Sequence, residues 1–117
     1  MSIRTYIAQK VSKLSQNQKT SKTNLHHIVA QSSYKAVPAR AVLLSVGIPI
    51  NSDENLVRIK DYVHWFMHTS VYYSWVNSLI CSSYVFSSSS NNGQLINVRM
   101  TLAFIKSTIT TIDKSII

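Results

Sequence analysis

The sequence predicts an α+β fold in which helices outweigh a very small sheet. Two short runs with β-branched residues, 25–30 and 56–59, are typical of strands, and a segment with helix punctuation separates them. Apolar residues near the C-terminus recur at spacings of three and four, which indicates a long amphipathic helix. The predicted order is helix, strand, inserted helix, strand, helix, loop and helix. At 117 residues, we expect one domain, 1–117, built around a two-stranded sheet.

The segment 1–24 is predicted to combine a helix with a basic arm. Apolar side chains at helical spacing predict a helix over 3–14, and the polar run 15–24 predicts a loop or arm. Its lysines could follow a nucleic-acid backbone without reading bases, and they are Lys10, Lys13, Lys19 and Lys22.

The middle of the chain carries clear helix boundaries. In 37–47, Pro38 suits the first turn of a helix, and Gly47 suits the residue just after its end. A turn-rich stretch then leads to the strand 56–59. Asp61 is a plausible N-cap for a helix that continues to about residue 80.

The C-terminal part is predicted as a loop followed by a helix. The stretch 82–93 is rich in Ser and Asn, and its serines at 87–90 indicate a flexible loop. The helix is predicted over 94–114, despite many β-branched residues of modest helix propensity. Its apolar stripe comprises Leu95, Val98, Leu102, Ile105, Ile109 and Ile112.

The charge of the chain points to an anionic partner. Twelve Lys and Arg against four Asp and Glu give a formal net charge of +8. Nucleic acid and an anionic membrane surface are the polyanions to consider, while a charge that serves only solubility is the alternative. The single cysteine, Cys81, excludes an internal disulfide and a cysteine-rich zinc module. No segment resembles a signal peptide or a membrane span, so we expect a soluble protein.

All four histidines fall in two short motifs, and these suggest a metal site. His64 and His68 are four residues apart, so they share one face of a helix. His26 and His27 are adjacent on a predicted strand, so they point to opposite faces, and one of them could join the helical pair. Alone, H-x-x-x-H is a weak signal, and ordinary core histidines are the alternative. Three neutral imidazoles with open positions would make a catalytic site that favours zinc, nickel, manganese or cobalt over magnesium.

Residues 25–76 resemble the AHH family of the HNH/endonuclease VII superfamily. The matching features are a His-His-Ile start, an Ala-Arg helix, Gly-Ile, an Asn before a short strand, and H-x-x-x-H-Thr with Tyr-Tyr. One departure is Leu25, where the family name implies Ala. The family consists of ββα-metal, or His-Me finger, nuclease domains that are common in bacterial polymorphic toxins. The resemblance implies a ββα-metal core over 25–81, with an antiparallel sheet, an inserted helix and flanking helices.

The resemblance also implies a role for each motif residue. His26, His64 and His68 would be ligands of one divalent metal ion, and His27 would be the general base that activates water. Asn55 would hold the loop or orient His27, with an ordinary turn residue as the alternative. The sequence leaves the reverse assignment of His26 and His27 open.

Nucleic-acid contacts are assigned to residues beside these motifs. The candidates are Arg40, Arg58 and Lys60, with a solvated surface charge as the alternative for each. The aromatic residues around the histidines could stack on bases but more often pack in the core. Among them Tyr72 is expected to be the most exposed.

The function implied is that of a metal-dependent endonuclease acting on DNA with little sequence preference. The alternatives are an RNA-cleaving nuclease of the same fold and a non-catalytic nucleic-acid-binding domain with a structural metal. An antibacterial toxin of this kind would be a monomer that a specialised secretion system delivers into the cytoplasm of a target bacterium. It would also need a cognate immunity protein, and an acidic surface on that partner would suit the positive charge of this chain.

Overall fold

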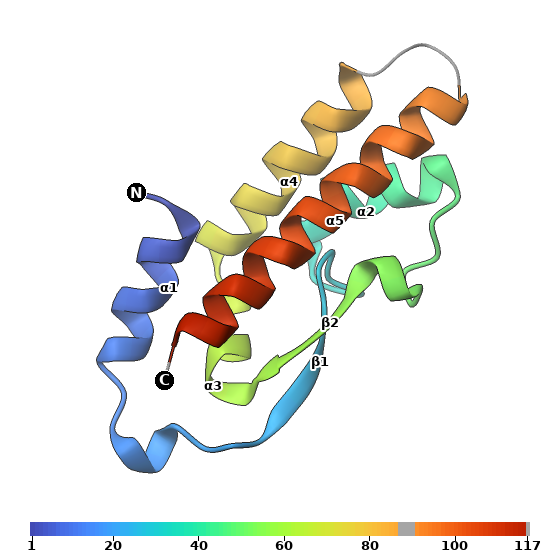
Figure 1. The fold of residues 1–117 in the computed structure, drawn as a ribbon. Coiled ribbons are helices and arrows are strands. Elements are labelled where there is room, and N and C mark those ends of the chain that lie inside the picture. The colour runs from blue at the N-terminus through green and yellow to red at the C-terminus, as the bar shows by residue number, and fades with distance from the viewer. Residues whose placement is uncertain (87–90, 117) are drawn as a thin grey trace.

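In the computed structural model, which describes residues 1–86 and 91–116, five helices pack with one two-stranded antiparallel sheet (Figure 1). This is the α+β architecture that the sequence predicts. The elements in chain order are α1 (Ile3–Ser12), β1 (Thr23–His27), α2 (Val37–Val46), β2 (Leu56–Lys60), α3 (Asp61–His64), α4 (Ser70–Val85) and α5 (Asn91–Ser115).

The helices α4 and α5 form the long axis of the molecule. Figure 1 shows them side by side, with α2 behind them and α1 beside their lower ends. The α4 helix contacts both α2 and α5, and α5 also contacts α1 and β2. The sheet and α3 therefore lie together at one end of the α4–α5 pair.

The two strands pair so that neighbouring side chains of β1 point to opposite faces. His26 lies opposite Val57, and both are buried, whereas the next pair, His27 and Leu56, points to the other face. Leu25, on the same face as His27, is half exposed. The opposite orientation expected for the adjacent histidines is confirmed.

The C-terminal helix supplies a continuous apolar face to the core, as its spacing predicts. Leu95 is partly buried at the start of this face. The other five residues of the predicted stripe are each at most 1% exposed, and they are Val98, Leu102, Ile105, Ile109 and Ile112. Helix α1 adds three buried residues to the same core, namely Ile3, Ile7 and Val11.

Local side-chain signals set the ends of α1 and α2. Ser2 caps α1, because its side chain accepts a hydrogen bond from the Thr5 backbone N–H at 3.1 Å. Pro38 lies in the first turn of α2, and Gly47 ends that helix with a φ of 81°, where a side chain would be strained. Both ends of α2 are confirmed.

The prediction of one continuous helix from Asp61 to about residue 80 is wrong. The chain instead forms α3, a single 3-10 turn over Trp65–Met67, and then α4. His68 leaves the helical region with φ −110° and ψ 37°, and Thr69 starts α4 by accepting a hydrogen bond from Tyr72 N at 3.3 Å. Asp61 is the first residue of α3 rather than its N-cap.

Other boundaries shift by a few residues. Strand β1 ends at His27, because the next two backbone N–H groups, of Ile28 and Val29, donate to the backbone and side-chain oxygens of Asn55 instead of pairing with β2. Helix α4 extends into the predicted loop 82–93, and α5 begins at residue 91. The serines at 87–90 lie outside the described residues.

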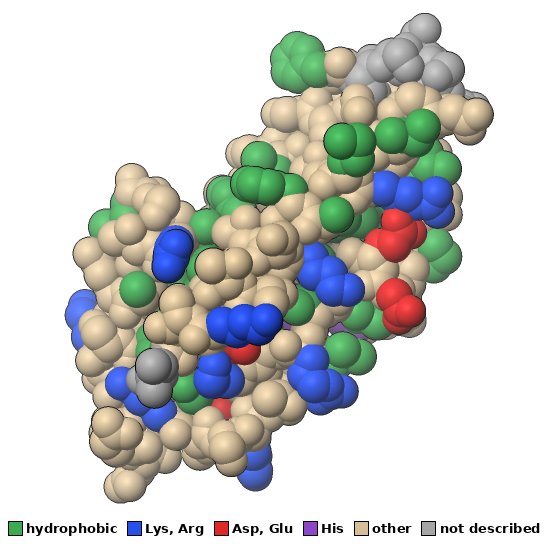
Figure 2. Space-filling view, in the orientation of Figure 1, with side chains coloured by type: hydrophobic (Ala, Val, Ile, Leu, Met, Phe, Trp, Pro, Cys, Tyr) green, Lys and Arg blue, Asp and Glu red, His purple; other side chains and the backbone are tan. Residues whose placement is uncertain are grey.

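Charged and apolar side chains gather at different ends of the surface. Figure 2 shows Lys and Arg mostly on the lower half of the face that carries α5, and hydrophobic side chains toward the upper end of α4 and α5. On this face, the end with the sheet and α1 is therefore the more basic end. Within the described part of the chain, no helix combines the length and apolarity needed to cross a bilayer.

Candidate active site

Three of the four histidines converge on one site, which runs from the buried His26 to the exposed His68. His26 points inward from β1 and is 1% exposed. His64 ends α3 and His68 follows the 3-10 turn, so the break in the predicted helix lies between them. Their Nε2 atoms nevertheless lie 2.9 Å apart, and one nitrogen from each of the three rings falls within 4.8 Å of the others.

A hydrogen-bond chain fixes which nitrogen His26 offers to this cluster. The buried Tyr72 hydroxyl donates its single proton to the Ile28 carbonyl oxygen at 2.7 Å. It must therefore accept from the His26 Nε2–H, which lies 2.9 Å away. Burial raises the pKa of Tyr72 well above its usual value, so the hydroxyl keeps its proton. Neutral His26 is left with a lone pair on Nδ1.

The Nδ1 atom of His26 has the properties expected of a metal ligand whose ion is not bound. It is buried and has no hydrogen-bond partner, which is costly for a polar atom unless something else satisfies it. Two nitrogens on one tetrahedral zinc lie roughly 3.4 Å apart, close to the His64–His68 separation of 2.9 Å. The His68 Nδ1 lies 3.1 Å from the Tyr73 hydroxyl, which can hold that ring with Nε2 toward the cluster. The three residues therefore fit a divalent ion.

The electrostatics of the cluster keep its imidazoles neutral. Burial, followed by the nearby His64 and His68 rings, lowers the pKa of His26 to about 2. Burial is also the main cause that lowers the pKa of His64 and of His68. Neutral rings are the form that binds a metal, and the cluster includes no carboxylate among the described residues. A bound divalent ion would keep its full charge and attract an anionic substrate.

His27 stands apart from the cluster on the outer side of β1. Its Nε2 lies 2.7 Å from the Oδ1 of the exposed Asn51. A carbonyl oxygen can only accept, so Nε2 carries the proton and Nδ1 is free to take one. This arrangement is the one needed for a general base.

The histidines meet at a pocket of about 290 Å³. His27, His64, His68 and Tyr73 form one part of its lining, and Leu25 lies at the same opening. The remaining wall is the segment after β1, comprising Ala30, Gln31, Ser32 and Ser33. A substrate in this pocket would contact His27 and two of the three clustered histidines at once.

Asn55 and Arg40 hold this pocket wall in place. The fully buried Asn55 side chain accepts from Val29 N at 2.8 Å and donates to the Val29 and Ile50 carbonyls. Arg40 Nη1 donates to the carbonyls of Ala30 and Ser33, at 2.8 and 2.9 Å. Asn55 therefore holds the loop, the first of the two roles considered for it. The side chain bonded to His27 is that of Asn51.

The other candidates for nucleic-acid contact differ in whether their side chains already interact with other residues. Arg58 is exposed on the same sheet face as His27, with only a long contact of 3.4 Å to Thr23 Oγ1. Lys60 forms an ion pair with Asp113 at 3.6 Å, which pins β2 to α5. The expectation that Tyr72 is exposed is wrong, because its side chain is fully buried.

The sequence gives little indication of three residues that the structure brings into the site. Asn51 shares the turn-rich stretch with Asn55, and the spacing does not show which of them reaches His27. Tyr72 and Tyr73 follow the second histidine motif, but their hydrogen bonds to His26 and His68 depend on the break before α4. Helical periodicity could have placed both tyrosines inward, although not against the histidines.

A model of AHH, a nuclease family of the HNH/ENDO VII superfamily with conserved AHH, matches residues 7–95. The chain belongs to this nuclease family. The AHH match covers more than half of the chain and includes all four histidines, Asn51 and Asn55. The resemblance over 25–76 is thereby confirmed. The chain has Leu25 at the first position of the AHH triplet. A search of curated proteins and of solved structures gives no match.

Proposed function

We propose that this AHH nuclease is a metal-dependent endonuclease that hydrolyses the phosphodiester bonds of DNA with little sequence preference. The main support for this proposal is that the four histidines occupy two separate positions around one pocket. Three of them converge on one point, while His27 faces the same pocket from a separate position and is oriented by Asn51. A metal-dependent nuclease can use both arrangements, since one supports charge stabilisation and the other supports proton transfer.

The residues that would hold the ion are His26 through Nδ1 and His64 and His68 through Nε2. A bound divalent ion would stabilise the charge that develops on the phosphoryl oxygens and on the departing 3′ oxygen. An imidazole shell favours zinc, nickel, manganese or cobalt over magnesium. Among the described residues, the ligand set consists of these three side chains, which supports an open catalytic site rather than a closed structural one.

His27 would act on the attacking water. Its Nδ1 takes a proton from water as the new bond from oxygen to phosphorus forms, while Asn51 keeps the opposite nitrogen protonated. The bond from phosphorus to the 3′ oxygen breaks, which leaves a 5′-phosphate and, after protonation, a 3′-hydroxyl. Hydrolysis requires no further reactant.

Contacts with the phosphate backbone would give binding without sequence reading. Arg58 lies on the sheet face of His27 and is the most available of the three predicted cations beside the motifs. Arg40 and Lys60 would act mainly through the pocket wall and the β2–α5 contact. Contacts to phosphates carry no sequence information, which supports low specificity.

The family resemblance and the charge support a role as an antibacterial toxin. We propose delivery into a target bacterium by a specialised secretion system and neutralisation by a cognate immunity protein. A net charge of +8 favours an acidic partner surface and rapid electrostatically steered association. Co-expression with the neighbouring gene product should relieve toxicity, and persistent toxicity with every such partner would argue against this role.

A plasmid-nicking assay with a metal series tests the activity. Purified protein, stripped with a chelator, should nick supercoiled plasmid only after zinc, nickel, manganese or cobalt is added. Parallel digestion of total RNA shows which of the two polymers is the substrate. Faster cleavage of RNA than of plasmid would indicate an RNA-cleaving nuclease. Bound metal without cleavage of either polymer would support a structural metal instead.

A further inference from the structure

An exposed tryptophan follows one histidine of the cluster in the chain. Trp65 follows His64 in the chain and is 48% exposed. The aromatic rings that contact the cluster, Tyr72 and Tyr73, are buried and bonded to its histidines. Trp65 instead turns a large apolar surface toward solvent, one residue along the chain from His64, which lines the pocket. Exposed indole rings next to a basic surface are suited to stacking on nucleic-acid bases.

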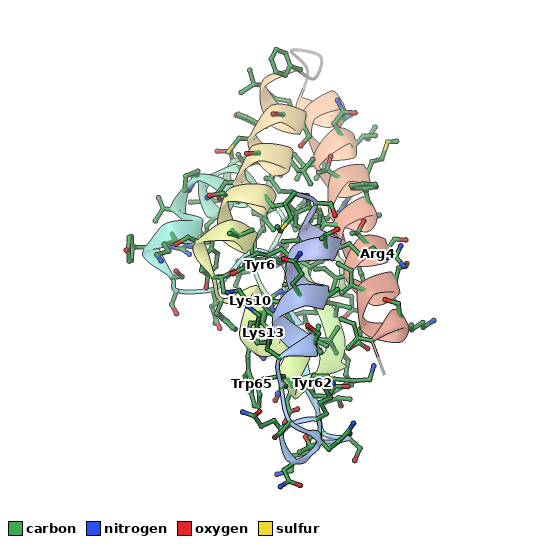
Figure 3. All side chains as sticks on the ribbon, turned by 90° about the vertical axis from the view of Figure 1, so that its left-hand side faces the viewer. Arg4, Tyr6, Lys10, Lys13, Tyr62 and Trp65 are labelled. Atoms are coloured by element: carbon green, nitrogen blue, oxygen red, sulfur yellow. The ribbon has the colours of Figure 1, made fainter. Side chains whose placement is uncertain are left out.

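A row of cations on α1 lies on the same side as this tryptophan. In Figure 3, Lys10, Lys13 and Trp65 lie on the left of α1, whereas Arg4 lies on the right. The α1 helix also contacts α3, which precedes Trp65 in the chain. Lys10 and Lys13 are about 4.5 Å apart along the helix axis, which is close enough to serve neighbouring phosphates of one strand.

The cations of α1 are held in position but not neutralised. Buried Ile3, Ile7 and Val11 fix the opposite face of the helix in the core. The Lys10 ammonium lies 5.5 Å from the centroid of the Tyr6 ring, an interaction that leaves its charge intact. The ion pairs found among the described residues use other cations, those of Lys60 and Arg99. The full charge of the α1 lysines is thus available to an anionic ligand.

We propose that Trp65 stacks on an unpaired base next to the cleaved bond, and that Lys10 and Lys13 hold phosphates of the same strand along α1. This inference rests on the proposed function, and it names the substrate as a single-stranded stretch of nucleic acid. An aromatic platform beside a basic track suits unstacked bases, because every base offers a π-face. In an intact duplex the bases are stacked on each other, and Trp65 would reach only backbone.

Binding without cleavage tests the stacking contact. Metal-free protein in a chelator is titrated into a labelled oligothymidylate and, separately, into a duplex of the same length. We expect Trp65→Leu to weaken single-strand binding by about tenfold, as expected when one base is no longer stacked, and to leave duplex binding unchanged. Trp65→Phe keeps an aromatic ring and should restore most of the affinity. Thermal melting of each variant checks that the fold is intact.

Salt dependence tests the track along α1. Removing one cation that binds a phosphate of a single strand should lower the slope of log affinity against log salt by about 0.7. We expect this fall for Lys10→Ala and for Lys13→Ala. Arg4→Ala is the matched control, because it removes one charge from the other side of the same helix and should leave the slope near that of the wild type.

Three results would overturn the inference. They are unchanged single-strand binding in Trp65→Leu, an equal weakening for strand and duplex, or the same slope change in Arg4→Ala as in Lys10→Ala. The plasmid assay is a separate test. A protein that cleaves plasmid but binds single strands without Trp65 refutes this surface alone, whereas one that binds as expected but never cleaves refutes the nuclease mechanism alone.

Discussion

The two faces of β1 give adjacent histidines opposite environments. On the inner face, His26 is buried, bonded to Tyr72, and so poorly solvated that its pKa falls to about 2. On the outer face, His27 is only partly buried, lines the pocket and bonds to the exposed Asn51. Two imidazole rings that are neighbours along the strand therefore differ in environment, because the first is enclosed and the second faces solvent.

This difference supports the proposed division of roles between the two histidines, which the sequence left interchangeable. A ring with a fixed tautomer and an unpaired buried nitrogen is suited to hold an ion, but it cannot readily exchange protons with water. A ring at a pocket is suited to take a proton from water and pass it to solvent. The twofold period of a strand is what separates them.

Removing the outer histidine should have the largest effect on catalysis. We expect His27→Ala to lower the plasmid-nicking rate by about 10² to 10⁴, the usual contribution of a general base, without changing the melting temperature. Rates at saturating metal would be compared with the wild type over a time course. Cleavage by His27→Ala at the wild-type rate would show that another group activates the water.

On the inner face, removing the Tyr72 hydroxyl should weaken metal binding by about 10- to 100-fold. The Tyr72→Phe change leaves His26 Nε2 without its acceptor, so the ring is no longer held with Nδ1 toward the cluster. Calorimetric titration with zinc measures the affinity. Tyr73→Phe is the matched control, and its smaller expected effect reflects the longer 3.1 Å contact to His68. Equal weakening in both variants would argue against a special role for the hydrogen bond between His26 and Tyr72.

Acid should destabilise the metal-free protein through the inner face. The pKa of His26 is about 2 when folded and about 6.5 when unfolded, so the unfolded state binds more protons below pH 6.5. Stability is full above about pH 6.5 and falls by about 1.4 kcal/mol per pH unit as the pH decreases. From His26 alone, we expect a decrease of about 2 kcal/mol at pH 5, measurable by urea unfolding. A free energy of unfolding that stays constant or rises over this range would contradict the buried neutral ring.

A smaller effect is expected from the hydrogen bond that orients the outer histidine. Asn51→Ala should slow nicking by about tenfold, the value of one good hydrogen bond, and leave zinc affinity unchanged. Asn51→Asp retains an acceptor oxygen and should keep most of the activity. If Asn51→Ala weakened metal binding instead, His27 would belong to the ion site.

Much of the fold follows from local patterns. The Pro38 and Gly47 signals give both ends of α2, and the apolar spacing gives the buried stripe of α5. The pairing of the two histidine motifs also follows, since helix and strand periods limit where the rings can point.

The missed features depend on the path of the chain in space. The break between Trp65 and Thr69 contains no Gly or Pro, and the apolar pattern continues through it. Helical periodicity therefore does not predict that the helix ends there. That break lets α4 begin anew and turns Tyr72 into the core against His26. The choice of Asn51 over Asn55 as the partner of His27 likewise depends on a turn that spacing alone does not define.

The most direct test of the division between the two faces is a comparison of metal binding by His26→Ala and His27→Ala. The two substitutions are one residue apart and chemically identical, and circular dichroism shows whether each variant keeps its fold. We expect His27→Ala to bind one zinc ion per chain with the affinity of the wild type. His26→Ala should weaken zinc binding by more than about 100-fold, which is the usual upper effect of losing a residue that only hydrogen-bonds to a metal ligand. Absence of zinc from His27→Ala, or its retention by His26→Ala, would contradict the assignment of the ion to the inner face of β1.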